Sequence, residues 1–113
     1  MQLDLVQGTL DVLVLRTLSW GAQHGYAVAR WIRESSGESL AVEDRALYVS
    51  LHRLETRGFI ESDWGLSENN RKAKYYRLTG AGRRELRAET ERWTKYAEAV
   101  FRVLSATPAR AAT

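Results

Sequence analysis

The spacing of apolar residues changes at Gly58 in this 113-residue chain, and this change restricts the fold more than any other feature. Before Gly58, apolar residues recur every three or four positions in segments divided by glycines, which predicts helices. After it come two short stretches rich in aromatic and alternating residues, which predict an antiparallel hairpin, and then a long helical pattern. The order indicates an α+β fold that is mainly α.

Three helices are expected before the change of pattern. They lie between Gly8 and Gly21, from about Gly25 to Ser35, and from Glu43 or Asp44 to Arg57. Thr9 is placed to cap the first helix and His24 the second, while Gly58 supplies the left-handed residue that ends the third. In the third helix Leu47, Leu51 and Leu54 follow helical spacing and are expected to face the core.

The predicted hairpin consists of the stretches FIESDW and AKYYRL, joined by a polar turn of eight residues, GLSENNRK. Thr79 can then cap a helix that runs to about Leu104. Within this helix apolar and small residues alternate spacings of four and three, which is typical of a dimerising heptad seam: Leu86, Thr90, Trp93, Ala97, Val100 and Leu104. Tyr96 and Phe101 flank the seam and widen it beyond what one small domain covers.

Composition excludes several classes of protein. The length suits one soluble domain, and the lack of cysteine excludes a disulfide scaffold, an iron–sulfur cluster and a thiol nucleophile. The first fifteen residues lack the basic start of a secretory signal, and no apolar run approaches the ~20 residues that cross a bilayer. We therefore expect a cytoplasmic protein.

The charge is unevenly distributed. The net charge is only +3, but the window from Arg71 to Arg87 holds seven basic residues and one acidic residue, so the rest of the chain is net negative. A concentrated positive charge favours a polyanionic partner.

Three helices, a basic hairpin and a long helix together predict a winged helix-turn-helix with a long C-terminal dimerisation helix, which would bind double-stranded DNA. If the third helix buries its leucines, its opposite side faces the major groove. The side chains expected there are Arg45, Tyr48, Val49 and His52, with Arg53 at the margin. Arg45 could contact a guanine, Tyr48 a phosphate, and Val49 a thymine methyl. On the wing, phosphate or polar contacts are expected from Asn69, Asn70, Arg71, Lys72 and Lys74.

Four segments resemble the PadR family of bacterial transcriptional regulators: GTLDVLVLRTL, HGYAVARWI, ALYVSLHRLETRGFIESDW and KYYRLTGAGRRELRAETERW. The resemblance implies a homodimeric repressor of a nearby promoter, of the short subgroup with a single C-terminal helix. It also implies that this helix packs against the first helix of the partner, and that the tyrosine of an L-Y motif, here Leu47-Tyr48, contacts the DNA backbone. The interface residues expected on this basis are Leu10, Leu13, Val14, Leu86, Trp93, Tyr96, Ala97, Val100, Phe101 and Leu104.

The chain differs from the family around the L-Y motif. The family usually has glycine or serine before the pair and proline after it, whereas this chain has Arg45-Ala46 and Val49. The family's operator bases are therefore not transferred to this chain. Family members often release DNA on binding planar aromatic compounds, and Trp93 is the residue that could line such a ligand site.

The expected organisation is a DNA-binding region over 1–79, a dimerisation helix over 80–105 and a frayed tail over 106–113. No cofactor is expected, and no metal site or catalytic constellation, because His24 and His52 stand apart from other ligand-type residues. Two alternatives to a regulator stay open at this point. One is a sensor or sequestration protein that binds small molecules around Trp93, and the other is a protein-interaction module in which the wing is merely solvated.

Overall fold

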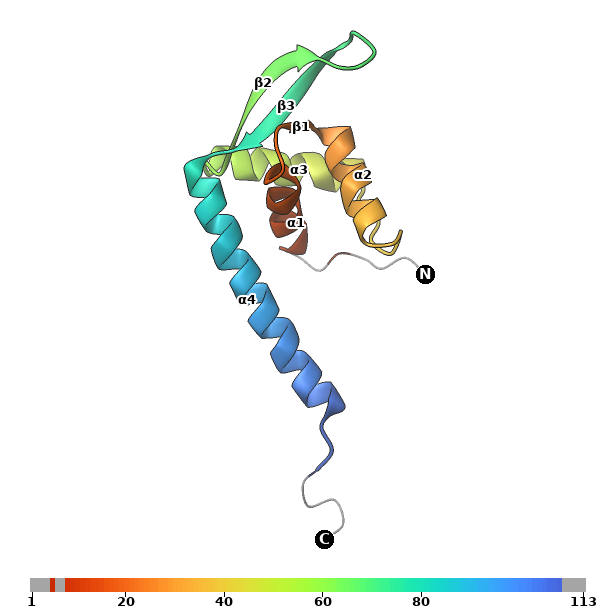
Figure 1. Ribbon diagram of the computed structural model, residues 1–113, viewed down its shortest axis with the longest axis vertical. Helices are drawn as coiled ribbons and strands as arrows, with labels where there is room; N and C mark the ends of the chain where they lie inside the picture. Colours follow the sequence, from red (N-terminus) through yellow and green to blue (C-terminus); the bar gives the residue numbers. More distant parts are fainter. Residues whose placement is uncertain (1–4, 6–7, 109–113) are drawn as a thin grey trace.

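The computed structural model describes residue 5 and residues 8–108, and it confirms the α+β, mainly helical architecture (Figure 1). The elements of the described chain are α1 (Thr9–Leu18), β1 (Gln23–His24), α2 (Gly25–Ser35), α3 (Asp44–Thr56), β2 (Ile60–Leu66), β3 (Lys72–Leu78) and α4 (Gly80–Ser105). Figure 1 shows the three shorter helices and the sheet gathered into a head, from which α4 extends as an arm. Residues 109–113 of the predicted tail lie outside the described part of the chain.

The core of the head lies where α1, α2 and α3 meet. The inward leucines of α3 are almost fully buried, as their spacing predicts, and they pack with apolar residues of α1 and α2. The core residues from the helices include Val14, Leu15, Leu18, Val28, Ile32, Leu47, Leu51 and Leu54. This shared core fixes α3 with its other side outward.

The helix ends largely follow the predicted signals. The Nδ1 atom of His24 accepts a hydrogen bond from the backbone N–H of Ala27 (3.2 Å), and Gly58 takes the left-handed conformation (φ 79°) just after α3. Thr9 does not cap α1. Gly8 is the N-cap residue, Thr9 is the first helical residue, and its buried hydroxyl has no hydrogen-bond partner among the described atoms.

The sheet has the strand order β1-β3-β2 with antiparallel pairing throughout. Strands β2 and β3 reach further toward the tip than the sequence predicts, so the connecting turn is 67–71 rather than eight residues. The turn is closed by a 2.8 Å hydrogen bond from the Ser67 N–H to the Arg71 carbonyl, and Asn70 adopts a positive φ of 60°. Strand β1 is not predicted because two residues are too few to show a period.

Helix α4 begins against the head and then leaves it. Thr79 caps it as predicted, accepting a hydrogen bond from the Gly82 N–H at 3.0 Å. At Gly82 a side-chain carbon would lie 1.9 Å from the carbonyl oxygen of Phe59, so only glycine permits this close approach. No helix in the described residues is both long and apolar enough to span a membrane.

Candidate nucleic-acid interface

Helix α3 presents one side to the core and the other to solvent. Leu47, Ser50, Leu51 and Leu54 are buried, whereas the four residues expected to meet DNA are all exposed: Arg45, Tyr48, Val49 and His52. Tyr48 and Val49 are each 51% exposed although both are large and partly apolar. Helix α3 therefore has the predicted orientation, with its leucines toward the core and its opposite side toward solvent.

Arg53, expected at the margin of this side, is exposed, and an acid on α1 also holds its guanidinium. The Nε and Nη2 atoms of Arg53 donate to the two carboxylate oxygens of Asp11 at 2.8 and 2.5 Å, and the buried hydroxyl of Ser50 donates to the same carboxylate at 2.6 Å. Burial alone would raise the pKa of Asp11, but the hydrogen bonds from Arg53 and Ser50 outweigh it and leave the pKa below its usual value. Arg53 therefore ties α3 to α1 rather than pointing freely outward.

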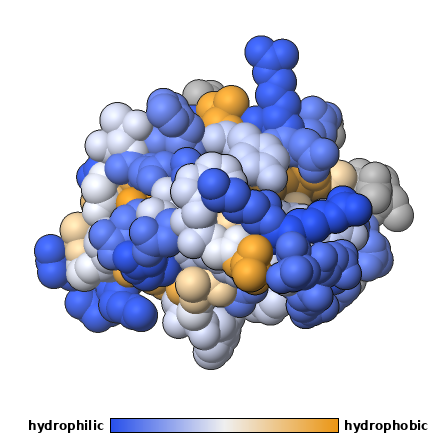
Figure 2. Space-filling model, turned by 90° about the horizontal axis from the view of Figure 1, so that it is seen from above, coloured by the Kyte–Doolittle hydropathy of each residue, from blue (hydrophilic) through white to orange (hydrophobic). Residues whose placement is uncertain are grey.

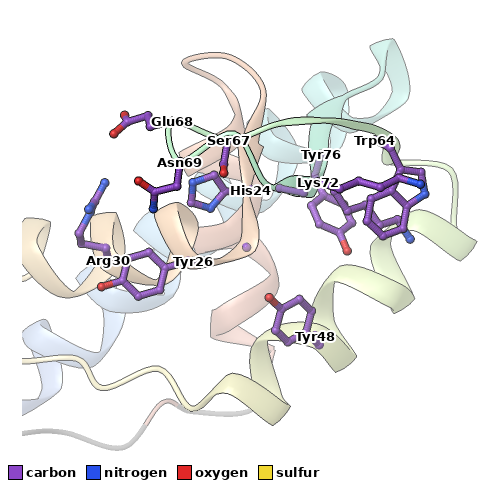
Figure 3. A pocket seen from close by; sticks show the side chains of 13 residues that line it. His24, Tyr26, Arg30, Tyr48, Trp64, Ser67, Glu68, Asn69, Lys72 and Tyr76 are labelled. Carbon is purple, nitrogen blue, oxygen red and sulfur yellow. The ribbon is translucent and has the colours of Figure 1, made fainter.

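The Tyr48 side chain is positioned by the start of α2. A side-chain carbon at Gly25 would lie 2.8 Å from the Tyr48 hydroxyl oxygen and 3.1 Å from the ring. The phenol of Tyr48 therefore rests directly over the first residue of α2, and the absence of a side chain at Gly25 makes the room. Figure 3 shows the Tyr48 hydroxyl directed into the space between α2, α3 and the wing.

This space is an open cleft of about 620 Å³. Its lining comes from three parts of the head: His24, Gly25, Tyr26 and Arg30 from β1 and α2, Tyr48 from α3, and Trp64, Ser67, Glu68, Asn69, Lys72, Ala73, Lys74 and Tyr76 from the wing. Burial raises the pKa of Tyr76, and the nearby Glu55 carboxylate raises it further, so the Tyr76 hydroxyl stays protonated. Three cations (Arg30, Lys72 and Lys74) and one acid (Glu68) line the cleft together with hydrogen-bond donors, so the net positive lining suits an anionic strand.

The two predicted wing lysines of the cleft differ in their partners. The Nζ atom of Lys74 lies 3.8 Å from a carboxylate oxygen of Glu55, so α3 partly neutralises it. The Nζ atom of Lys72 instead lies 5.1 Å from the ring centre of Trp64. Arg71, Asn69 and Asn70 are exposed in or beside the turn, as expected of residues at a wing tip.

The basic window from Arg71 to Arg87 is not one surface. Arg77 lies on the opposite face of the hairpin, where its guanidinium pairs with Glu61 at 3.0 Å and Asp63 at 2.5 Å. Arg83, Arg84 and Arg87 lie on α4. Only the first part of the window therefore belongs to the cleft. Figure 2 views the molecule from the wing end and shows a largely hydrophilic face with isolated apolar side chains.

The predicted interface residues divide into three groups by their exposure. Val14 has no exposed area, and Leu10 and Leu86 are also buried, because all three belong to the core of their own chain. Leu13, Trp93 and Ala97 are partly buried, with the Trp93 ring edge-on to Tyr96 at 5.9 Å. The remaining predicted residues form an exposed apolar face with Val103, which consists of Tyr96, Val100, Phe101, Val103 and Leu104. We call these five residues the α4 apolar face.

Acidic residues on α4 have structural partners. Glu89 pairs with Arg92 three residues on, and Glu91 accepts from the Nζ atom of Lys95 at 2.9 Å, four residues on. Within residues 5 and 8–108, no three His, Cys, Asp or Glu side chains are placed to hold a metal ion.

An exposed face on the third helix, a cleft beside it and a cationic hairpin define a winged helix-turn-helix DNA-binding protein. The chain belongs to the family described as "Transcriptional regulator PadR-like family", whose family model matches residues 14–88. Its role is therefore regulatory rather than enzymatic.

Solved structures of similar proteins agree with this assignment. A PadR family transcriptional regulator from Eggerthella lenta is 31% identical, with 89% of this chain and 86% of that chain covered and a TM-score of 0.75. A transcriptional regulator from Clostridium thermocellum is 28% identical, with 85% and 90% covered and a TM-score of 0.77. A PadR family regulator from Clostridium difficile is 26% identical, with 87% and 100% covered and a TM-score of 0.76.

Sequence reasoning did not assign nine lining residues of the cleft to the site: His24, Gly25, Tyr26, Arg30, Trp64, Ser67, Glu68, Ala73 and Tyr76. The three on α2 show no signal in the spacing of α3 or in the charge window, since only the fold brings the start of α2 beside Tyr48. For Trp64 a signal exists, because its strand also carries Glu61, Ser62 and Asp63, which leaves little core available to a tryptophan further toward the tip.

Proposed function

We propose that this DNA-binding regulator is a homodimeric, sequence-specific repressor of a nearby promoter. The observation that carries the proposal is the pairing of two unlike surfaces. The outward side of α3 and the cleft combine donors and cations suited to DNA. The α4 apolar face, on the outer half of the long C-terminal helix, suits a protein partner. As a regulator of transcription, the protein would act in the cytoplasm, where bacterial DNA lies.

On the DNA, α3 would enter a major groove with its exposed side toward the bases. Arg45 would present its guanidinium fork to guanine, Val49 would contact a thymine methyl, and His52 would donate to a base or a phosphate. The Tyr48 hydroxyl, directed into the cleft, would donate to a phosphate of the strand that passes there. Arg71, Lys72 and Lys74 would neutralise further phosphates.

A second copy of the chain would cover the α4 apolar face. Large contiguous apolar surfaces are rare on monomers, and a two-fold dimer uses the same patch from both chains. With the heads held apart by α4, the two α3 helices would reach successive major grooves, about 34 Å apart, on a pseudo-palindromic operator. Promoter occlusion would then give repression.

A planar aromatic effector is the second candidate activity. Trp93 stands edge to face with Tyr96 of the α4 apolar face, so a flat ligand could stack there between the two chains of a dimer. A ligand that binds more tightly to dimers whose heads are wrongly spaced for the operator would increase the population of those dimers and so lower operator affinity. Titration of tryptophan fluorescence with planar aromatics, with a gel shift in parallel, tests this.

The central test of the DNA role uses Tyr48→Phe, which removes only the hydroxyl. We expect operator affinity in a gel shift on the DNA upstream of the protein's own reading frame to fall roughly tenfold, because a hydrogen bond to a charged phosphate is lost. Tyr75→Phe is the matched control, since its hydroxyl lies on the opposite face of the wing, where it donates to the Leu66 carbonyl at 3.1 Å, and its removal should leave affinity unchanged. Unchanged affinity of Tyr48→Phe would refute the phosphate contact.

A further inference from the structure

The two faces of the wing hairpin differ in chemistry. Residues alternate between faces along paired strands, so each cross-strand pair belongs to one face. One face carries the acids Glu61 and Asp63, both paired with Arg77. The other face begins at the buried pair Ile60–Leu78 and continues outward through Ser62–Tyr76, Trp64–Lys74 and Leu66–Lys72.

This second face keeps its apolar character after it has left the core. Ile60 is buried at its base, but Trp64 is 63% exposed and Leu66 is 68% exposed further out. The same stretch carries Lys72 and Lys74, with the Lys72 Nζ atom lying over the Trp64 ring. An exposed tryptophan costs free energy in water, and its burial by a partner would recover that cost.

The occupant of this face must have both negative charge and apolar surface. Trp64 lies on the wing wall of the cleft, and Tyr48 lies on the α3 wall (Figure 3). A DNA strand offers this combination, because its phosphates alternate with deoxyribose rings whose carbon edges are apolar. The lysines match the phosphates, and the indole matches the sugars.

We infer that Trp64 packs against deoxyribose of the DNA strand that occupies the cleft, so that the wing contributes an apolar contact as well as neutralising phosphates. The inference rests on the proposed function of the cleft. Because burying an indole releases no counterions, the Trp64 contribution is insensitive to salt, whereas that of Lys72 is not. Trp64 and Lys72, which are neighbours on one face, thus contribute through apolar burial and through charge, and the two contributions can be measured separately.

The chain offers a matched control in Trp20. Trp20 follows α1, is 62% exposed, and has the Arg16 guanidinium 4.5 Å from its ring centre. It therefore equals Trp64 in exposure and in having a cation over its ring. Trp20 does not line the cleft, so its removal should leave DNA binding unchanged.

The experiment measures affinity for a duplex of the upstream DNA at several salt concentrations. We expect Trp64→Ala to bind roughly tenfold more weakly at every salt concentration, with an unchanged slope of log affinity against log salt. Lys72→Ala should lower that slope by about 0.9, and Trp20→Ala should match the wild type. Trp64→Phe should retain most of the affinity, since it keeps an aromatic ring.

Hydroxyl-radical footprinting adds a direct readout, because the radicals attack deoxyribose. Wild type should protect a short run of sugars beside the wing, and Trp64→Ala should expose those sugars while the protection under α3 persists. Wild-type affinity for Trp64→Ala, or a changed salt slope with unchanged sugar protection, would overturn the inference and leave the proposed function standing. Failure of the wild type to bind the duplex at all would instead overturn the proposed function.

Discussion

The head buries most of its large apolar side chains, whereas the outer half of α4 exposes them to solvent. In the head, the leucines of α3 and most of the valines and leucines of α1 are packed out of water. Along α4 the change occurs within one helix, from Leu86 at 9% exposure to Leu104 at 74%. The head therefore contains a complete core of its own, while the outer half of α4 has an apolar face that its own chain leaves uncovered.

This difference separates folding from assembly. A side chain buried by its own chain contributes to the stability of the head, whereas one on the α4 apolar face contributes when a second molecule covers it. Substitutions in the two regions should consequently affect different measurements.

Leu51→Ala should have the largest effect. Leu51 is fully enclosed in the head, so the substitution should lower the free energy of unfolding by about 2–5 kcal/mol through lost apolar contact and a cavity. Urea denaturation followed by circular dichroism measures this loss. A loss below about 1 kcal/mol would mean that the core of the head can rearrange around the cavity, which would weaken the contrast between the two regions.

Leu104→Asp should break the dimer and leave the head folded. A carboxylate within the proposed apolar interface loses hydration without gaining a partner, so we expect dimer affinity to fall at least about a hundredfold. Light scattering on a sizing column should give the monomer mass, with an unchanged circular dichroism spectrum. Arg102→Asp also adds negative charge, but about 160° around the helix from Leu104 and opposite the α4 apolar face, and it should stay dimeric. A dimer that survives Leu104→Asp would place the interface elsewhere.

Asp11→Asn should have the smallest effect, and it tests how α3 is held to the head. The variant weakens the contacts to Arg53 and Ser50 and should lower the free energy of unfolding by about 1 kcal/mol at neutral pH. In the wild type the folded-state pKa of Asp11 lies below its unfolded value, so this stabilisation is complete above the unfolded value and is lost as pH falls through the folded one.

The matching measurement is denaturation across the acid range. The stability difference between wild type and Asp11→Asn should be greatest near neutral pH and should shrink as the carboxylate takes up its proton. A difference that stays constant down to strongly acidic pH would show that the charge of Asp11 does not hold α3 in place.

Much of the fold could be predicted because its signals are local. The spacing of the inward leucines of α3 predicts a helical face, Gly58 predicts a helix end, and His24 and Thr79 predict caps. Each of these signals depends on residues only a few positions apart. Strand β1 and the cap of α1 could not be predicted in this way. The first depends on pairing with β3 across the chain, and the second is provided by the backbone of Gly8 rather than by Thr9.

The candidate site was predicted in part for the same reason. The outward face of α3 follows from helical spacing alone, but the partner of Arg53 lies on another helix, and the seat of Tyr48 lies at the start of α2. Charge counting grouped Arg77 with the wing cations, although strand alternation places it on the opposite face beside two acids. Residue spacing predicts which side of a helix or strand faces outward. The contacts that side makes with other elements depend on the assembled fold.

The most direct test of the account is a footprint of the wild-type protein on the DNA upstream of its own reading frame. Two protected blocks of similar size, with centres about one helical turn or roughly 10 base pairs apart, are expected from two heads joined through α4. Protection of a single block, or uniform weak protection along the whole fragment, would contradict the claim that paired heads read DNA through α3.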